Sequence, residues 1–137
     1  MKTNSATLDS MLKHAQEMMT RSYAPYSNFH VGACIRTSKN NFYSGCNNEN
    51  ASYSLAQCAE ATAIGVMISA GETQIAEIMI AAKCSEPCPP CGACRQRIRE
   101  FAAGDTLIHM YNASNHNFLT MTLDELLPCS FGPQLLK

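Results

Sequence analysis

The sequence predicts an α/β protein, a three-layer α-β-α sandwich around a five-stranded mixed sheet. Five segments have the length and apolar content of strands, and four show helical spacing of apolar residues, in the order α-β-β-α-β-α-β-β-α. This alternation places helices on both faces of one sheet. The 137 residues contain no internal repeat and no break in composition, so we expect a single domain over residues 1–137.

The first third of the chain predicts one helix and a strand hairpin. Residues 7–21 carry apolar side chains at helical spacing, and Pro25 favours an irregular loop after them. Residues 31–37 and 41–46 have strand composition and flank a Ser-Lys-Asn turn, which indicates a hairpin. Residues 47–57 are polar and lack periodicity, so we interpret them as a loop of a functional site.

The middle of the chain alternates helix, strand and helix. Residues 59–70 predict a second helix that Gly71 terminates. Residues 75–82 are apolar at nearly every position, which is typical of a central strand buried on both faces. Residues 93–103 predict a third helix, and we expect Gly104 to close it.

The last third predicts a second pair of strands and a short final helix. Residues 106–111 and 118–122 have strand composition and are joined by a polar turn at residues 112–117. Thr122 and Glu125 have the spacing of a capping box, which predicts that a helix begins there.

Composition and charge narrow the classes of function. The chain is 46% apolar and 15% charged, as folded globular proteins are. Its formal net charge is −1 and its ten basic residues are scattered, so it lacks the basic stripe that grips nucleic acid. No run is apolar enough to span a membrane, and Met1-Lys-Thr-Asn-Ser5 lacks the apolar core of a signal peptide. We expect a small uncharged partner, with no nucleic acid and no membrane.

Three cysteines and one glutamate form the motif with the clearest chemistry. Cys58-Ala-Glu60 is followed, about thirty residues later, by Pro90-Cys91-Gly-Ala-Cys94. Three thiolates suit Zn²⁺, and a zinc ion with three protein ligands keeps its fourth position for water, as catalytic zinc does. Glu60 is then placed to act as general base for that water. This spacing, with a glutamate that is not a ligand, is the described signature of zinc deaminases.

Both parts of the motif fall at predicted helix starts. Cys58 opens the second helix, and Cys91 and Cys94 open the third. Unpaired N–H groups and positive dipole ends at these starts offset part of the charge of three thiolates. Glu60 would take a proton from water and return it to a ring nitrogen and a leaving amine, as hydrolytic deamination requires.

Other interpretations of the cysteines stay open at this point. Cys91-Gly-Ala-Cys94 alone is more typical of a structural zinc site, which a fourth cysteine could close. The candidates for that fourth ligand are Cys34, Cys46, Cys84 and Cys88. Cys88-Pro-Pro-Cys91 also has the spacing of a redox dithiol. Because Cys58 and Glu60 accompany the pair, we favour a catalytic zinc.

The number of cysteines bears on the compartment. The chain has eight, and if three bind metal an odd number remains, which argues against a disulfide framework. Free cysteines pack as small apolar residues in a reducing compartment, so we expect a cytoplasmic protein. The remaining five are Cys34, Cys46, Cys84, Cys88 and Cys129.

Further segments resemble the small, three-cysteine, homotetrameric cytidine deaminases along almost the whole chain. No single segment is decisive, but their combination is highly specific. The segments are Tyr23-Ala-Pro-Tyr-Ser-Asn-Phe29, Val31-Gly-Ala33, Gly45-Cys-Asn-Asn-Glu-Asn-Ala-Ser-Tyr53, Cys58-Ala-Glu60, Pro90-Cys-Gly-Ala-Cys-Arg-Gln96, Glu125-Leu-Leu-Pro128 and Phe131-Gly-Pro133.

The resemblance implies a reaction and a cofactor. It implies one Zn²⁺ per subunit and conversion of cytidine and 2′-deoxycytidine, with water, to uridine or 2′-deoxyuridine and ammonia in pyrimidine salvage. It also implies that Asn47 and Glu49 hydrogen-bond the sugar 3′-hydroxyl, which argues for an unblocked sugar. Two alternatives remain: a deaminase of a modified or antibiotic cytosine nucleoside, and a zinc-stabilised binding module without catalysis.

The resemblance assigns four further residues to the nucleoside. Phe29 would lie against the base or sugar, and the backbone N–H of Ala59 would meet the base carbonyl. Tyr53 and Phe131 would reach the pocket of a neighbouring subunit. We therefore expect a homotetramer whose active sites are shared between subunits.

Two departures from the family pattern have chemical consequences. Ala61 stands where the family usually has an arginine that tempers the thiolate charge, so the zinc would be more electron-rich unless Arg95, Gln96 or another donor compensates. The loop before Cys91 is longer than the usual Ser-Pro, and its Cys88 could pair oxidatively with Cys91.

Overall fold

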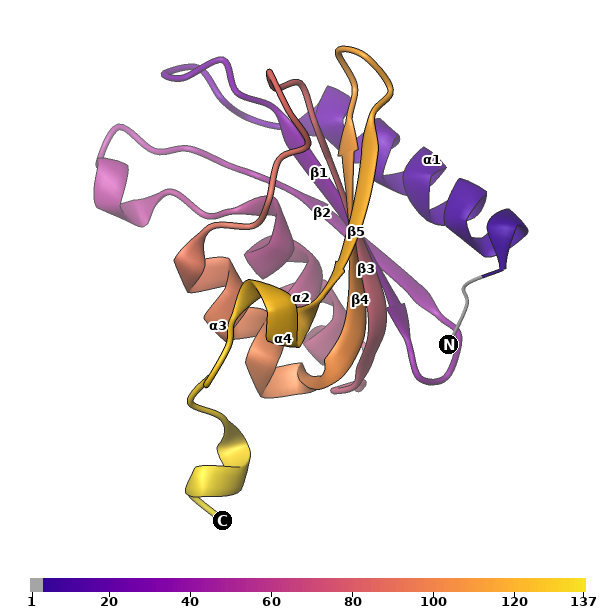
Figure 1. The fold of residues 1–137 in the computed structure, drawn as a ribbon. Coiled ribbons are helices and arrows are strands. Elements are labelled where there is room, and N and C mark those ends of the chain that lie inside the picture. The colour runs from indigo at the N-terminus through magenta and orange to yellow at the C-terminus, as the bar shows by residue number, and fades with distance from the viewer. Residues whose placement is uncertain (1–3) are drawn as a thin grey trace.

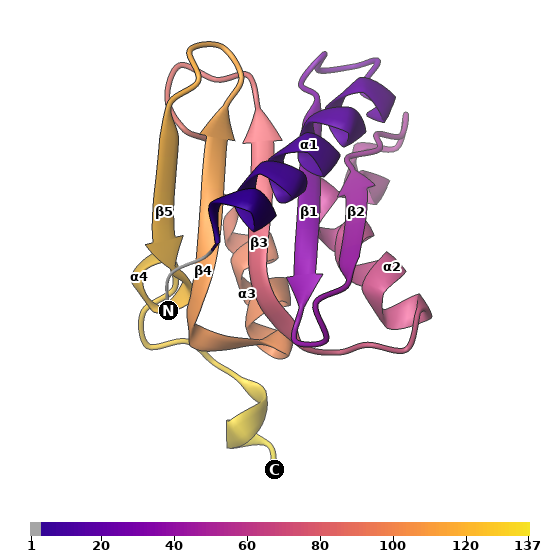
Figure 2. The same cartoon turned by 90° about the vertical axis from the view of Figure 1, so that its right-hand side faces the viewer.

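The architecture comes from a computed structural model that describes residues 4–137. The segment Met1–Ser5, which we expect not to be a signal peptide, has its first three residues outside that range. Five strands form one mixed sheet in the order β2-β1-β3-β4-β5, which confirms the predicted class (Figure 2). They are β1 (Val31–Thr37), β2 (Phe42–Cys46), β3 (Ile75–Ala82), β4 (Ala102–Asn112) and β5 (Phe118–Thr122). Only β3 and β4 are parallel; the other neighbours are antiparallel.

Helices cover both faces of this sheet, as the three-layer prediction requires (Figure 1). On one face, α1 (Ser5–Arg21) packs against β1, β2 and β3. On the other, α2 (Ala59–Ser69) packs on β1 and β2, while α3 (Gly92–Phe101) and α4 (Leu123–Leu126) pack on β4. The predicted capping box is present at the start of α4. Two 3-10 helices complete the chain, η1 (Tyr53–Leu55) and η2 (Pro133–Leu135).

The core divides into two parts on either side of β3, which is buried on both faces as its apolar sequence predicts. On the α1 side, Met79 packs with Met11. On the other side, Ile78 packs in a cluster with Met67 of α2 and Ile98 of α3. Within residues 4–137, no helix has the length and apolarity needed to cross a bilayer.

Two glycines let helices approach the sheet closely. A Cβ at Gly32 of β1 would stand 1.8 Å from the carbonyl oxygen of Ala15, and one at Gly45 of β2 would stand 2.5 Å from the backbone nitrogen of Ala63. Any side chain at either position would push its helix away. Gly45 therefore fixes α2, and with it Cys58 at the start of that helix.

The predicted end of the third helix is wrong. The sequence predicts a helix over residues 93–103 closed by Gly104, but α3 ends two residues earlier. Ala102 is extended (φ −138°, ψ 147°) and pairs with Ile75, because β4 begins directly where the helix ends. Gly104 lies inside β4, where a Cβ would stand 2.2 Å from a carboxylate oxygen of Asp124. Gly104 therefore does not end a helix. A small residue is needed there because Asp124 of α4 packs against it.

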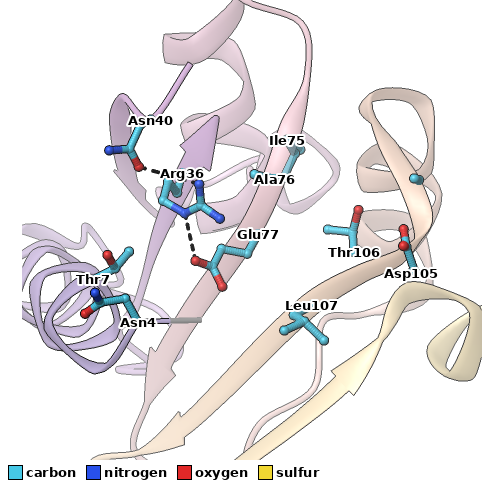
Figure 3. Close-up of a pocket in the computed structure, with 11 residues that line it drawn as sticks. Asn4, Thr7, Arg36, Asn40, Ile75, Ala76, Glu77, Asp105, Thr106 and Leu107 are labelled. Carbon is cyan, nitrogen blue, oxygen red and sulfur yellow. Dashed lines mark hydrogen bonds and ion pairs between the residues drawn. The ribbon is translucent and has the colours of Figure 1, made fainter. Parts of the chain in front are cut away.

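A buried polar row crosses the sheet on the α1 side. Glu77, the one charged residue of β3, is 1% exposed. Arg36 Nε of β1 donates to its Oε1 at 2.8 Å, and His109 Nε2 of β4 lies 2.8 Å from its Oε2. His109 Nδ1 lies 2.9 Å from Thr120 Oγ1 of β5. Figure 3 shows Arg36 and Glu77 facing each other at a hollow of about 440 Å³.

Candidate metal centre and active site

The three predicted metal ligands come together at the starts of two helices. Cys58 is the N-cap of α2, Cys91 is the N-cap of α3, and Cys94 lies in the first turn of α3. Their sulfur atoms all lie within 4.8 Å of one another, and those of Cys58 and Cys91 are 4.0 Å apart. Tetrahedral Zn–S bonds of about 2.3 Å require sulfurs about 3.8 Å apart, so the three residues fit zinc.

Within the described part of the chain, residues 4–137, the cluster consists of three ligands and no fourth. Among residues 4–137, no other cysteine, histidine, aspartate or glutamate joins the three sulfurs at ligand spacing. The closed four-cysteine site that the sequence left open is therefore not assembled. Three ligands with an open position are the arrangement of catalytic zinc.

Backbone geometry explains why these sulfurs are available. Cys58 and Cys91 both have extended dihedrals, and their carbonyls accept the first helical hydrogen bonds from Thr62 and Arg95. Neither cysteine side chain caps its own helix. The unpaired N–H groups of both first turns lie beside the cluster, where they stabilise negative charge.

Electrostatics favour a thiolate at this centre. Hydrogen bonding from the Cys94 thiol is the main cause that lowers the pKa of Cys58 to about 6, and Cys91 adds a second hydrogen bond. The positive charge of Arg97 lowers it further. Donating that hydrogen bond raises the pKa of Cys94. Charge therefore collects on Cys58 when no metal is bound.

Arg97 is a residue that the sequence reasoning missed. It follows Cys94 by three positions, a spacing that places two side chains on neighbouring turns of one helix face. The two named alternatives are engaged elsewhere. Arg95 donates to the carbonyl oxygens of Pro90 and Leu126. Gln96 donates to the carbonyl oxygen of Phe131 at 2.9 Å.

Glu60 is the buried carboxyl group of the site. It lies in the first turn of α2 and is 5% exposed. Burial is the largest cause that raises its pKa to about 7, and the charge of Cys58 adds to the effect, while a hydrogen bond from Cys94 opposes it. A carboxyl group with that pKa can both take up and release a proton near neutral pH.

A cleft of about 310 Å³ connects the metal cluster to the predicted substrate residues. Its lining includes Glu60, two of the three cluster cysteines and four of the six residues expected to contact substrate. The two cysteines are Cys58 and Cys91, and the four expected substrate residues are Phe29, Asn47, Glu49 and Ala59. Cys88 and Pro89 form part of the same wall. The volume suits a small molecule of nucleoside size.

The Asn47 and Glu49 side chains also organise the loop after α1. Asn47 Oδ1 accepts from the backbone N–H of Val31 at 2.9 Å, and its Nδ2 donates to the Phe29 carbonyl at 2.8 Å. Glu49 Oε1 accepts from the backbone N–H groups of Tyr26 and Ser27. The Ser27 hydroxyl donates a hydrogen bond to Glu49 Oε2, and this bond is the main cause that lowers the pKa of Glu49. The loop that carries Phe29 is thus tied to the loop that carries the polar pair.

Two predicted substrate residues lie outside the cleft. Tyr53 is 75% exposed, packs 5.7 Å from the ring of Tyr26, and lines an adjoining hollow of about 280 Å³. Phe131 is 56% exposed in the C-terminal segment. That segment extends away from the sheet (Figure 1). In one chain, therefore, neither ring lines the cleft beside the cysteine cluster.

Comparisons with known proteins agree with this geometry. The sequence profile for the cytidine and deoxycytidylate deaminase zinc-binding region matches residues 5–110. A cytidine deaminase of Halalkalibacterium halodurans is 38% identical over 121 residues, 88% of this chain and 91% of that relative. One of Sporosarcina psychrophila is 33% identical over 130 residues, 95% of each chain. The crystal structure of cytidine deaminase from Burkholderia pseudomallei superposes with a TM-score of 0.84 at 35% identity, covering 90% of this chain and 98% of that one.

Fold and site together define a class, the α/β proteins with a three-cysteine metal centre beside a buried carboxyl group, as in hydrolytic zinc deaminases. Within this class, the profile match over residues 5–110 and the relatives that are more than 30% identical indicate one particular family. The chain belongs to the cytidine and deoxycytidylate deaminase family and is an enzyme of the cytidine deaminase kind.

Proposed function

We propose that this enzyme hydrolyses cytidine and 2′-deoxycytidine to uridine and 2′-deoxyuridine with release of ammonia, using one Zn²⁺ per subunit held by Cys58, Cys91 and Cys94. The observation that carries the proposal is the meeting, in one small cleft, of three sulfurs with no fourth ligand among residues 4–137 and a buried glutamate. Zinc, when bound, would act as a Lewis acid that makes a water molecule nucleophilic.

Glu60 has the role of proton carrier in this proposal. The oxygen of water bonds to the amine-bearing carbon of cytosine, and the bond from that carbon to the amine breaks. A carboxylate oxygen of Glu60 takes one proton from water and delivers it to the ring nitrogen, where it stays. It then takes the remaining proton of the hydroxyl now bonded to carbon and delivers it to the amine, which leaves as ammonia. Because Glu60 is buried, its carboxyl group exchanges protons with the bound substrate more readily than with bulk water.

The remaining cleft residues would bind and orient the nucleoside. Ala59 lies in the first turn of α2, where its backbone N–H is free to donate to the base carbonyl. Phe29 offers an aromatic face for the base or sugar. Asn47 Nδ2 retains a second hydrogen for the 3′-hydroxyl. Glu49 Oε1 already accepts two hydrogen bonds, whereas Oε2 accepts one and retains a lone pair for the same hydroxyl.

We further propose that the whole of residues 1–137 acts as one domain in a cytoplasmic homotetramer that serves pyrimidine salvage. Tyr53 and Phe131 both lie at the surface, where a neighbouring subunit can reach them. Tyr53 also packs against the exposed ring of Tyr26, and contiguous apolar groups at a surface mark contact regions, which supports shared sites. Light scattering after size-exclusion chromatography tests the tetramer. Loss of activity in Phe131→Ala, a substitution outside the residues that line the cleft of the same chain, tests the shared site.

The experiment that tests the reaction is ultraviolet monitoring of cytidine conversion, with zinc measured on the same sample. Turnover by a zinc-loaded sample supports the proposal, and a zinc-replete sample inert toward cytidine and 2′-deoxycytidine contradicts it. The modified-nucleoside alternative predicts faster turnover of a 3′-substituted analogue than of cytidine. The Asn47–Glu49 pair favours the opposite result, because a blocked 3′-oxygen cannot donate to the carboxylate.

A further inference from the structure

The C-terminal segment, residues 128–137, is held to the body of the protein by side chains of α3. Within residues 4–137, no backbone–backbone hydrogen bond joins this segment to another part of the chain. Arg99 Nε donates to Ser130 Oγ at 2.9 Å, and Arg99 Nη2 donates to Gln134 Oε1 at 3.0 Å. One guanidinium group therefore binds the segment at two places, on either side of Phe131.

Phe131 itself is tied between those two places. Its carbonyl accepts from Gln96 Nε2 at 2.9 Å, and Gln96 precedes Arg99 by three positions, so both side chains leave the same face of α3. The next residue, Gly132, is buried, and a Cβ there would stand 2.7 Å from Arg99 Cζ. The missing side chain lets the guanidinium close over the segment. The backbone at Phe131 is thus fixed, while its ring stays exposed.

We propose that Arg99 is a positioning residue for nucleoside binding, which holds Phe131 in place for the cleft of a neighbouring subunit. The inference rests on the shared active site of the function proposed above. Arg99 neither lines the cleft of its own chain nor belongs to the metal cluster, so it acts through the segment and not on the substrate. The segment extends away from the sheet (Figure 1), as an arm that reaches a second copy of the chain requires.

Fixing the ring in advance favours binding, because a segment that is already ordered loses little freedom when the complex forms. Without the guanidinium, only the Gln96 bond of the three side-chain bonds would remain, and the segment would have to be ordered each time substrate binds. Binding would weaken, whereas proton transfer at Glu60 would proceed as before. A residue that only stabilised α3 would behave differently. Its loss would disturb Cys94 in the first turn of that helix and lower both zinc content and kcat.

The first test is Arg99→Met, which removes the guanidinium and keeps the apolar stem of the side chain. We expect KM for cytidine to rise about tenfold, because two hydrogen bonds to a charged group are lost, while kcat and zinc content stay unchanged. Arg21→Met is the matched control, since the Arg21 guanidinium pairs with Glu17 within α1 and lines no part of the cleft. Its KM should equal that of the wild type. A wild-type KM in Arg99→Met would overturn the inference.

Gln134 offers a second test that leaves α3 intact. Gln134→Ala removes one of the two acceptors of Arg99, so KM should rise by about two- to threefold. Gln134→Glu keeps an acceptor for the guanidinium and should have the KM of the wild type. Equal KM values in these two variants would count against the inference.

Phe131→Ala removes the ring through which Arg99 is proposed to act. It should lower kcat/KM at least as far as Arg99→Met does. The two substitutions combined should give the kcat/KM of Phe131→Ala alone, because a guanidinium that only positions the ring then has nothing to position. Losses that multiply in the double variant would show that Arg99 acts by another route and would overturn the inference.

A fluorescent reporter measures the position of the ring without turnover. The chain contains no tryptophan, so Phe131→Trp provides a single fluorophore. In the assembled enzyme its emission should lie at the short wavelength of a buried indole, and adding Arg99→Met should shift it to longer wavelength. An emission that Arg99→Met leaves unchanged contradicts the inference. A sample that shows the shift but never converts cytidine keeps the role of Arg99 in placing the ring and loses the proposed reaction instead.

Discussion

Two buried glutamates on opposite faces of the sheet have opposite uses. Glu77 on the α1 side is 1% exposed and Glu60 on the α2 side is 5% exposed. Glu77 is paired with Arg36 and His109, which satisfy both of its oxygens. Within residues 4–137, no ion pair includes Glu60, which instead lies beside the Cys58 charge with a raised pKa. A buried carboxylate with a cation holds strands together, and one without a cation is poised for proton transfer.

The largest expected effect follows from removing the Glu60 carboxylate. Glu60→Gln should lower kcat for cytidine by about 10²–10⁴-fold, because an amide cannot carry the proton. Zinc content should stay unchanged, since the glutamate is not within ligand spacing of the sulfurs. Steady-state kinetics with metal analysis on one sample measure both. A kcat equal to that of the wild type would contradict the proton-transfer role that distinguishes Glu60 from Glu77.

The same substitution at Glu77 is the matched control. Glu77→Gln should leave kcat nearly unchanged but lower the free energy of unfolding by about 2–3 kcal/mol, because Arg36 and His109 lose a charged partner. Urea unfolding followed by circular dichroism measures the loss. A fall in kcat as large as that of Glu60→Gln would show that both faces serve catalysis.

The third variant concerns Glu49, a carboxylate that holds a loop in place and is also proposed to bind the substrate. Glu49 ties the loop after α1, and the Ser27 hydroxyl keeps its pKa low. The ionised form therefore stabilises the folded loop at neutral pH, and this contribution is lost as pH falls through the lowered pKa. We expect Glu49→Gln to raise KM by about tenfold at neutral pH, from one weakened charged hydrogen bond. KM of the wild type should rise at acidic pH while KM of the variant stays flat; parallel profiles would contradict this role.

The smallest effect concerns the cation near the metal cluster. Arg97→Gln removes a positive charge that lowers the pKa of Cys58, but Arg97 is exposed and solvent screens it. We expect a zinc affinity lower by about two- to fivefold, measured by competition with a chromophoric chelator. Adding Ala61→Arg to Arg97→Gln should restore the affinity. An unchanged zinc affinity in both variants would contradict a role for Arg97. The starts of α2 and α3 would then be the main source of positive potential at the cluster.

Local patterns predicted much of this molecule. The order of elements, the central strand β3 and the cluster of Cys58, Cys91 and Cys94 follow from apolar periodicity and ligand spacing, both of which act over short stretches of chain. The end of α3 did not follow, because the pairing of Ala102 with Ile75 overrides a glycine signal. Long-range contacts decided that boundary.

The same limit explains what was missed at the site. A lone glutamate in an apolar strand gives no sign that Arg36 and His109 will meet it from two other strands. Likewise, the loop contacts of Asn47 and Glu49 join segments about twenty residues apart. Arg97 could have been found, since its spacing from Cys94 is a local helical one.

X-ray absorption at the zinc edge of the purified enzyme tests the central claim most directly. Three sulfur ligands at about 2.3 Å and one oxygen or nitrogen ligand at about 2.0 Å are the predicted result. A shell of four sulfurs would contradict it, because a zinc ion closed by a fourth cysteine has no position left for water.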